Sequence, residues 1–179
     1  ELNHPEFANS GIPQGKLFIN SEELINGIDD DGNGAVDDIF GASFATNSPD
    51  GNVNDEGSYA DCGHGTMVAS IMSGETNNSV GIASASWKGK ILPVKAFGLN
   101  YTTTAATILK SLEYTIKRYD AAKRSNPRIK FILNLSISLG RQKISSIENA
   151  LDAIISRKIP IIAAAGNSKL LGPDYPASS

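Results

Sequence analysis

The sequence lacks the features that mark membrane, nucleic-acid-binding and disulfide-stabilised proteins. No apolar run reaches the roughly 18 residues of a membrane-spanning helix. A net charge of −3 leaves no basic surface for nucleic acid, and a single cysteine cannot form an internal disulfide. The composition, 40% hydrophobic and 20% charged over 179 residues, is typical of a globular domain with a sizeable core. We therefore expect neither a membrane nor a nucleic acid as a partner.

Histidine is also scarce, and one of the two histidines has a distinctive setting. His64 stands between Gly63 and Gly65, directly ahead of a run of apolar and small residues that predicts a helix. Backbone N–H groups at a helix start have no partner within the helix, so a histidine there occupies a rigid corner and its ring can face a cleft. Imidazole can take and return a proton near neutral pH. On this stretch alone, a histidine that is merely packed is an equally good interpretation.

The single cysteine lies two residues before that histidine. Cys62 and His64 could in principle form a nucleophile and its base. Side chains so close in sequence rarely aim at a common reacting atom, and we favour a small buried thiol instead.

A second stretch of interest is an apolar run that ends in a polar pair. Residues 160–165 read Pro-Ile-Ile-Ala-Ala-Ala and predict a buried parallel strand. Gly166 and Asn167 follow at its carboxyl end, where open α/β sheets bind their ligands. The side-chain amide of Asn167 can donate a hydrogen bond to a developing oxyanion. The alternative is an ordinary turn residue.

Strand and helix patterns alternate from about residue 80 onward, which indicates an α/β fold. We predict strands over residues 90–96, 128–136 and 159–165, and a helix over residues 104–124 with an N-cap from the threonines at 102–104. Ser145 and Glu148 have the spacing of a capping box that opens a further helix. The residues expected to face the core are Ile108, Leu109, Leu112, Ile116 and Tyr119 on the first helix, and Ile147, Leu151, Ile154 and Ile155 on the second.

The first 60 residues differ from the rest, because they are rich in Gly, Asn and Asp and show little periodicity. Within these predicted loops, oxygen-bearing side chains stand at the alternating spacing that begins a calcium-binding loop, and a glycine occupies the sixth position. The predicted ligands of a structural Ca²⁺ are Asp29, Asp31, Asn33 and Asp37. Phe40 occupies the twelfth position, where an EF-hand needs glutamate, so an acidic, solvated turn is the alternative interpretation.

Several stretches, taken in order, resemble the subtilisin-like serine proteases, the subtilases. They are Asn3-His4-Pro5-Glu6-Phe7, residues 63–73, Val80-Gly81-Ile82-Ala83, residues 90–95, residues 131–138, residues 163–167 and Tyr175-Pro176-Ala177. The resemblance implies an α/β fold, a three-layer α/β/α domain with a mainly parallel sheet. Residues 1–60 would form its loop-rich beginning and residues 61–179 its α/β part. Acidic Gly-rich stretches and calcium-bound surface loops are also common in the family, especially in secreted bacterial members, so we expect an extracytoplasmic, bacterial protein.

The resemblance implies a serine endopeptidase with an Asp–His–Ser triad, in that chain order. This chain would supply His64 as the general base and Asn167 as the oxyanion donor. The aspartate would lie just before Glu1, and the serine, in a Gly-Thr-Ser motif that this sequence does not contain, beyond Ser179. We therefore expect a fragment of one catalytic domain in a longer parent protein, inactive by itself. Its partners would be the rest of that domain and a polypeptide substrate, with a propeptide as a further candidate.

The resemblance also assigns a substrate cleft. A substrate strand would lie beside Ser136, Ile137 and Ser138, although Ser138 stands where the family usually has glycine. The pocket for the residue before the cut would have a wall of Ala164, Ala165 and Gly166, which predicts a roomy, apolar site.

Two other classes of function remain. An inactive subtilase-fold binding module would lack the nucleophile in its full-length form. A calcium-stabilised structural or adhesive domain would depend on the acidic loop, residues 27–38, alone.

Overall fold

The computed structural model describes residues 1–7, 15–55, 63–167 and 172–179. These residues make up two compact units, Glu1–Thr103 and Thr104–Ser179. Cys62 lies outside the described residues. Within the described part of the chain, no helix is both long and apolar enough to cross a membrane.

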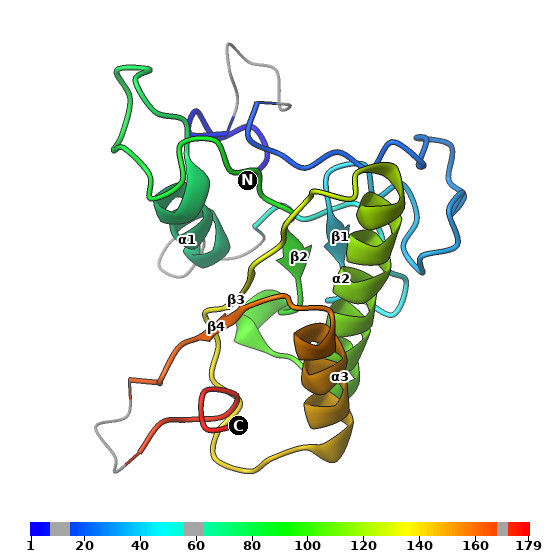
Figure 1. Cartoon of the computed structure of the whole chain (residues 1–179), viewed down its shortest axis with the longest axis vertical. Helices are drawn as coiled ribbons and strands as arrows, with labels where there is room; N and C mark the ends of the chain where they lie inside the picture. The colour runs from blue at the N-terminus through cyan, green and yellow to red at the C-terminus, as the bar shows by residue number, and fades with distance from the viewer. Residues whose placement is uncertain (8–14, 56–62, 168–171) are drawn as a thin grey trace. The chain divides into compact units, whose positions relative to one another are not determined.

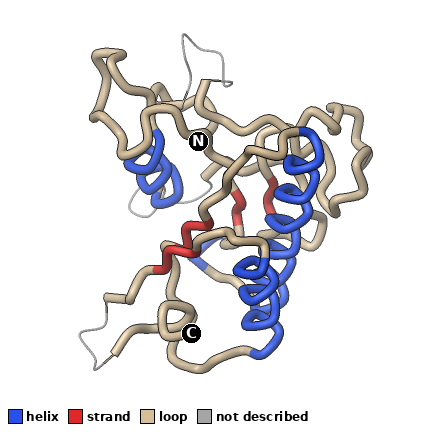
Figure 2. The backbone as a smooth tube through the Cα atoms, in the orientation of Figure 1, coloured by secondary structure: helices blue, strands red, loops and turns tan. Residues whose placement is uncertain are grey.

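The first unit consists mostly of loops, as its composition predicts (Figure 2). Strand β1 (Ala42–Ser43) pairs in parallel with β2 (Val94–Lys95), and an isolated parallel bridge joins Leu17 to Ile91. The predicted strand over residues 90–96 is therefore present but short. The other elements are helix α1 (His64–Ser73) and a 3₁₀ turn, η1 (Leu99–Tyr101).

The second unit has the alternating order that the sequence predicts. Helix α2 (Ala105–Ser125), strand β3 (Leu133–Leu135), helix α3 (Ser145–Ser156) and strand β4 (Ile161–Ala163) follow one another. Strands β3 and β4 are parallel, with Asn134 opposite Ile162, and α3 forms the crossover between them (Figure 1). This arrangement confirms the α/β expectation.

The start of α2 confirms the predicted threonine cap. The hydroxyl oxygen of Thr104 accepts a hydrogen bond from the backbone N–H of Thr107 at 3.1 Å. The helix ends at Ser125, one residue further than predicted and two before Pro127, where a helix cannot continue. Thr104 therefore fixes the beginning of α2, and the proline limits its end.

The predicted capping box on α3 is wrong. The N-cap is Ile144, which makes no side-chain cap, and Ser145 already lies inside the helix. The helix begins one residue earlier than the motif requires, so Glu148 stands one position too far along to reach back to the cap. Its carboxylate instead accepts a hydrogen bond from the Ser179 hydroxyl at 2.7 Å and lies 3.6 Å from the Lys143 ammonium.

The core of the second unit lies where α2 packs against α3 (Figure 1). The predicted core residues on these two helices that the structure buries are Ile108, Leu112, Tyr119, Ile147, Leu151 and Ile154. Leu109 and Ile116 are only half-buried. Ile155 was predicted to face the core but is 58% exposed, because the buried stripe runs through Ala150 and ends at Ile154.

The prediction that β4 is a buried strand is also wrong. Ile161 and Ala163 are half-buried, whereas Ile162 between them is 57% exposed. Alternate residues of a strand point to opposite faces, so only one face of β4 is covered.

Two neighbouring isoleucines on α3 test this assignment of the core. Ile154→Ala is expected to lower the free energy of unfolding by about 2–5 kcal/mol, because Ile154 is completely buried. Ile155→Ala, which removes the same atoms from an exposed position, is expected to stay within about 0.5 kcal/mol of the wild type. Urea unfolding of both variants measures the difference, and equal losses would contradict the assignment.

Candidate active site

His64 is the first residue of α1, and an unusual glycine precedes it. Gly63 caps the helix with φ at 98°, a left-handed conformation that glycine adopts without strain, and its carbonyl accepts the N–H of Met67 at 2.7 Å. Within the first turn, the Thr66 hydroxyl donates to Asp55 at 2.6 Å, which ties the helix start to the preceding chain. The His64 side chain is exposed. The structure thus confirms that this histidine stands at a helix start.

A pocket of about 580 Å³ lies in the second unit, beyond the carboxyl ends of β3 and β4. Its size is typical of a site for a small ligand or a side chain. The residues that line it are Ser136, Ile137, Ser138, Ala164, Ala165, Gly166, Asn167 and Asp174. All the residues that the sequence assigns to the substrate cleft therefore line one pocket, together with Asn167.

A returning segment of chain borders this pocket. The N–H of Asp174 donates to the carbonyl of Ala165 at 2.9 Å, which joins the segment to the chain that follows β4. Tyr175 exchanges backbone hydrogen bonds with the chain beyond β3, accepting from Leu139 at 2.8 Å and donating to Gly140 at 2.7 Å. The segment is thus anchored to the extensions of both strands and brings Asp174 into the lining of the pocket.

The expectation of an apolar pocket is wrong, because Asp174 lines it. Asp174 is 8% exposed, and its Oδ2 accepts a hydrogen bond from the Ser138 hydroxyl at 2.8 Å. A Cβ atom at position 166 would lie 2.2 Å from the same Oδ2, so only glycine fits there. The sequence places Asp174 directly before the Tyr175-Pro176 pair. Nothing in that local pattern shows that the aspartate folds back between the two strands.

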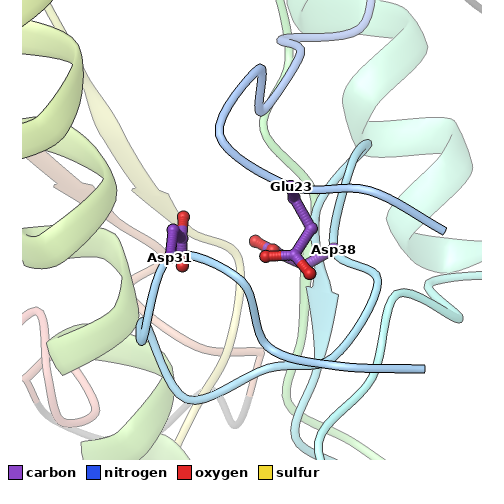
Figure 3. A group of neighbouring side chains, drawn as sticks. All are labelled: Glu23, Asp31 and Asp38. Atoms are coloured by element: carbon purple, nitrogen blue, oxygen red, sulfur yellow. The ribbon is translucent and has the colours of Figure 1, made fainter. Parts of the chain in front are cut away.

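Three acidic side chains in the first unit form what we call the carboxylate cluster: Glu23, Asp31 and Asp38. Each offers an oxygen within 4.8 Å of those of the other two (Figure 3). Glu23 and Asp38 are buried at 3% and 0% exposure, respectively. In Figure 3 the carboxylates of Glu23 and Asp38 lie together, and Asp31 faces them from the acidic loop. Carboxylate oxygens gathered in this way are the ligands that Ca²⁺ prefers.

The carboxylate cluster differs from the predicted ligand set. Of the four predicted residues, only Asp31 belongs to it. Asp29 accepts the backbone N–H groups of Asn33 and Gly34, which shapes the loop. Asp37 likewise accepts the backbone N–H groups of Asn26 and Gly27. Asn33 donates its amide to Asp38 and so supports the cluster indirectly.

The negative charge of the Glu23 carboxylate is only partly compensated by the residues around it. Its Oε1 accepts the N–H groups of Asp30 and Asp37, whereas Oε2 is buried and has no hydrogen-bond partner in the structure. Burial raises the pKa of this carboxyl above its usual range, and the negative charges of Asp38 and Asp31 raise it further. The N–H groups of Asp30 and Asp37 act in the opposite direction. A cation among the three carboxylates would compensate both the burial and the repulsion.

Comparison with known proteins identifies the family. The family model described as the subtilase family matches residues 1–179. The chain is 35% identical over 120 residues to Subtilisin-like protease 1 of Plasmodium falciparum (isolate 3D7), which covers 66% of this chain and 16% of that protein. It is 30% identical over 137 residues to an "Extracellular protease" of Xanthomonas campestris pv. campestris, which covers 68% of this chain and 23% of that protein.

A solved structure supports the same fold. Sphericase superposes with a TM-score of 0.60 at 19% sequence identity, covering 76% of this chain and 42% of that chain. The molecule is thus a partial α/β domain of the subtilisin fold, and the chain belongs to the subtilase family. It spans between about a sixth and two fifths of the length of these three proteins.

The pocket segment makes stability depend on pH in the alkaline range. Tyr175 is completely buried, and burial, reinforced by the negative charge of Glu148, raises its pKa to about 12. An unfolded tyrosine ionises near pH 10. The stability contributed by neutral Tyr175 is therefore complete below pH 10 and is lost as the pH rises toward 12.

We expect Tyr175→Phe to reduce this alkaline loss, although it also removes a buried hydroxyl and shifts stability at neutral pH. The measurement is the free energy of unfolding in urea between pH 8 and pH 11.5, relative to each protein's value at pH 8. Curves of the same shape for the variant and the wild type would show that Tyr175 does not titrate in this way.

Proposed function

We propose that this chain forms part of the catalytic domain of a serine endopeptidase that hydrolyses peptide bonds with an Asp–His–Ser triad. The observation that carries the proposal is the pocket at the ends of β3 and β4, which has Asn167 in its lining in a chain of the subtilase family. His64, exposed at the start of α1, is the general base. The aspartate and the serine come from other segments of the parent protein, so the 179-residue chain alone is inactive.

The proposed reaction is acyl transfer through a tetrahedral intermediate. The serine hydroxyl attacks the carbonyl carbon of the scissile peptide bond while His64 takes its proton. The side-chain amide of Asn167 donates a hydrogen bond to the oxygen on which negative charge develops. His64 then passes the proton to the leaving amine, and water hydrolyses the acyl-enzyme by the same steps. The aspartate holds the imidazole of His64 in the required tautomer.

The substrate binds in an extended conformation along the chain that follows β3. Ser136 and Ile137 are half-buried and Ser138 is exposed, and all three line the pocket and continue a strand edge. Backbone hydrogen bonds to such an edge bind peptides with little regard to their sequence. The side chain that precedes the scissile bond enters the pocket beside Ala164 and Ala165. Selectivity therefore depends on the pocket and not on the strand edge.

We further propose that a structural Ca²⁺ binds the carboxylate cluster of Glu23, Asp31 and Asp38. The support is the buried, unpartnered Oε2 of Glu23 and the mutual repulsion of three carboxylates that lie so close together. These residues supply three of the six to eight oxygen ligands that Ca²⁺ takes in proteins. The ion would hold the acidic loop to the segment that carries Glu23. A secreted location, a bacterial source and a propeptide remain predictions, and the name of the Xanthomonas relative supports the first of them.

The roles of His64 and Asn167 can be tested in the parent protein. Asn167→Ala is expected to lower kcat by about 10²–10³-fold with little change in KM, a loss of the size measured for such a donor in subtilisin, itself a member of this family. His64→Ala is expected to abolish labelling of the serine by a fluorophosphonate probe, because the hydroxyl then lacks its base. Labelled mass and peptide hydrolysis are the two measurements.

Asn149→Ala serves as the matched control, because Asn149 is an exposed asparagine on α3 that does not line the pocket. It should leave both measurements unchanged. Folded wild-type parent protein that neither reacts with the probe nor cleaves peptides would favour the inactive binding module. Unchanged kcat in Asn167→Ala would refute the oxyanion role.

The calcium proposal predicts a difference between two adjacent glutamates. Calcium should raise the unfolding temperature of the wild-type parent protein, by the equivalent of about 2.7 kcal/mol at 100 times its Kd. Glu23→Gln should remove most of this gain, whereas Glu22→Gln, a change at an exposed neighbour, should preserve it. Without calcium, Glu23→Gln should be at least as stable as the wild type at neutral pH, because ionised Glu23 opposes folding there. An equal response to calcium in Glu23→Gln and the wild type would refute the site.

A further inference from the structure

We propose that the pocket selects a cationic side chain, an ammonium or guanidinium group like those of lysine and arginine, and that Asp174 is the residue that selects it. This inference rests on the proposed function, which makes the ligand a side chain of a peptide substrate. It specifies the chemical class of that side chain.

The position of Asp174 is fixed by the structure around it. Its backbone N–H is bonded to Ala165, and its Oδ2 accepts from the hydroxyl of Ser138 at 2.8 Å. The carboxylate lies against Gly166, where no side chain can come between it and the pocket. Because both the backbone and the side chain are held, the negative charge stays at one place in the pocket. Ser138 thereby acts as a positioning residue for Asp174.

The carboxylate has acceptor capacity left for a ligand. A carboxylate offers about four lone-pair sites, and the Ser138 hydroxyl, a neutral donor, uses one of them. The ion pairs found among the described residues do not include Asp174. A negative charge that is 92% buried and lacks a cationic partner favours a ligand that brings a positive charge. It disfavours an acidic side chain by like-charge repulsion.

The remaining lining suits the stem of such a side chain. Ile137, Ala164 and Ala165 supply aliphatic surface along the pocket. Lysine and arginine have long apolar stems that pack against surfaces of this kind and place the charge at the tip. A pocket with aliphatic walls and one fixed carboxylate therefore fits them better than it fits a wholly apolar residue, which would bury Asp174 without compensating its charge.

Binding of small probes to the folded parent protein tests this inference without any need for catalysis. Benzamidine is a cation, and benzamide is its neutral counterpart of nearly the same shape. We expect the wild type to bind benzamidine about 10- to 100-fold more tightly than benzamide, the range of one charge-assisted hydrogen bond. Asp174→Asn, which keeps the shape and an acceptor for Ser138, should remove most of this preference. Titration calorimetry gives both affinities.

Asp152→Asn is the matched control, because it removes the same charge from an exposed position on α3. It should leave the preference intact. A parallel assay uses peptides that differ only in having lysine or leucine before the scissile bond. Asp174→Asn should lower kcat/KM for the lysine peptide by about 10- to 100-fold and should not lower it for the leucine peptide.

Several results would overturn the inference. Equal binding of benzamidine and benzamide to the wild type would do so, and this measurement stands even if Asp174→Asn fails to fold. An undiminished preference in folded Asp174→Asn would also do so. Failure of the proposed function gives a different result, since a parent protein that binds benzamidine through Asp174 and cleaves no peptide upholds the inference and refutes the peptidase.

Discussion

The second unit depends on the parallel pairing of β3 with β4. This pairing aligns the carboxyl ends of two strands that a whole helix separates in the chain. Its last backbone hydrogen bond, from the N–H of Ala164 to the carbonyl of Leu135, involves a residue that lines the pocket. In the same unit, α2 packs against α3. A further backbone hydrogen bond beyond this ladder places Asp174 beside Ala165. A slip of one residue in the register would turn the lining residues to the opposite face.

The first unit is organised by polar contacts. Its strands are only two residues long, and its acidic loop is shaped by carboxylates that accept backbone N–H groups. The buried carboxylates of Glu23 and Asp38 raise the same physical question as Asp174 in the other unit. In both places neutral hydrogen-bond donors hold a buried carboxylate, and a cation would compensate its negative charge.

The sequence predicts the elements of this fold better than it predicts their contacts. Periodicity locates the helices within a few residues, and the pattern at Thr104 gives its cap correctly, because these signals are local. The capping box at Ser145 fails since helix α3 starts one residue earlier. The carboxylate cluster and the place of Asp174 in the pocket cannot be predicted from the sequence, for a different reason. Glu23 and Asp174 reach their partners only through the path of loops, and loop paths leave no periodic signal in a sequence.

The close approach of Gly166 to Asp174 constrains how this pocket can change over evolutionary time. Position 166 has a left-handed backbone and no room for a Cβ atom, so mutation there is blocked twice. Asp174 is not among the described residues with a positive φ. With Asp174 in the proposed role, lineages that descend from such a protein can acquire new substrate preferences by a single codon change at 174, while the left-handed backbone retains the glycine at 166. Among related sequences, variation at position 174 beside a constant glycine at position 166 would then reflect the close approach of these two residues.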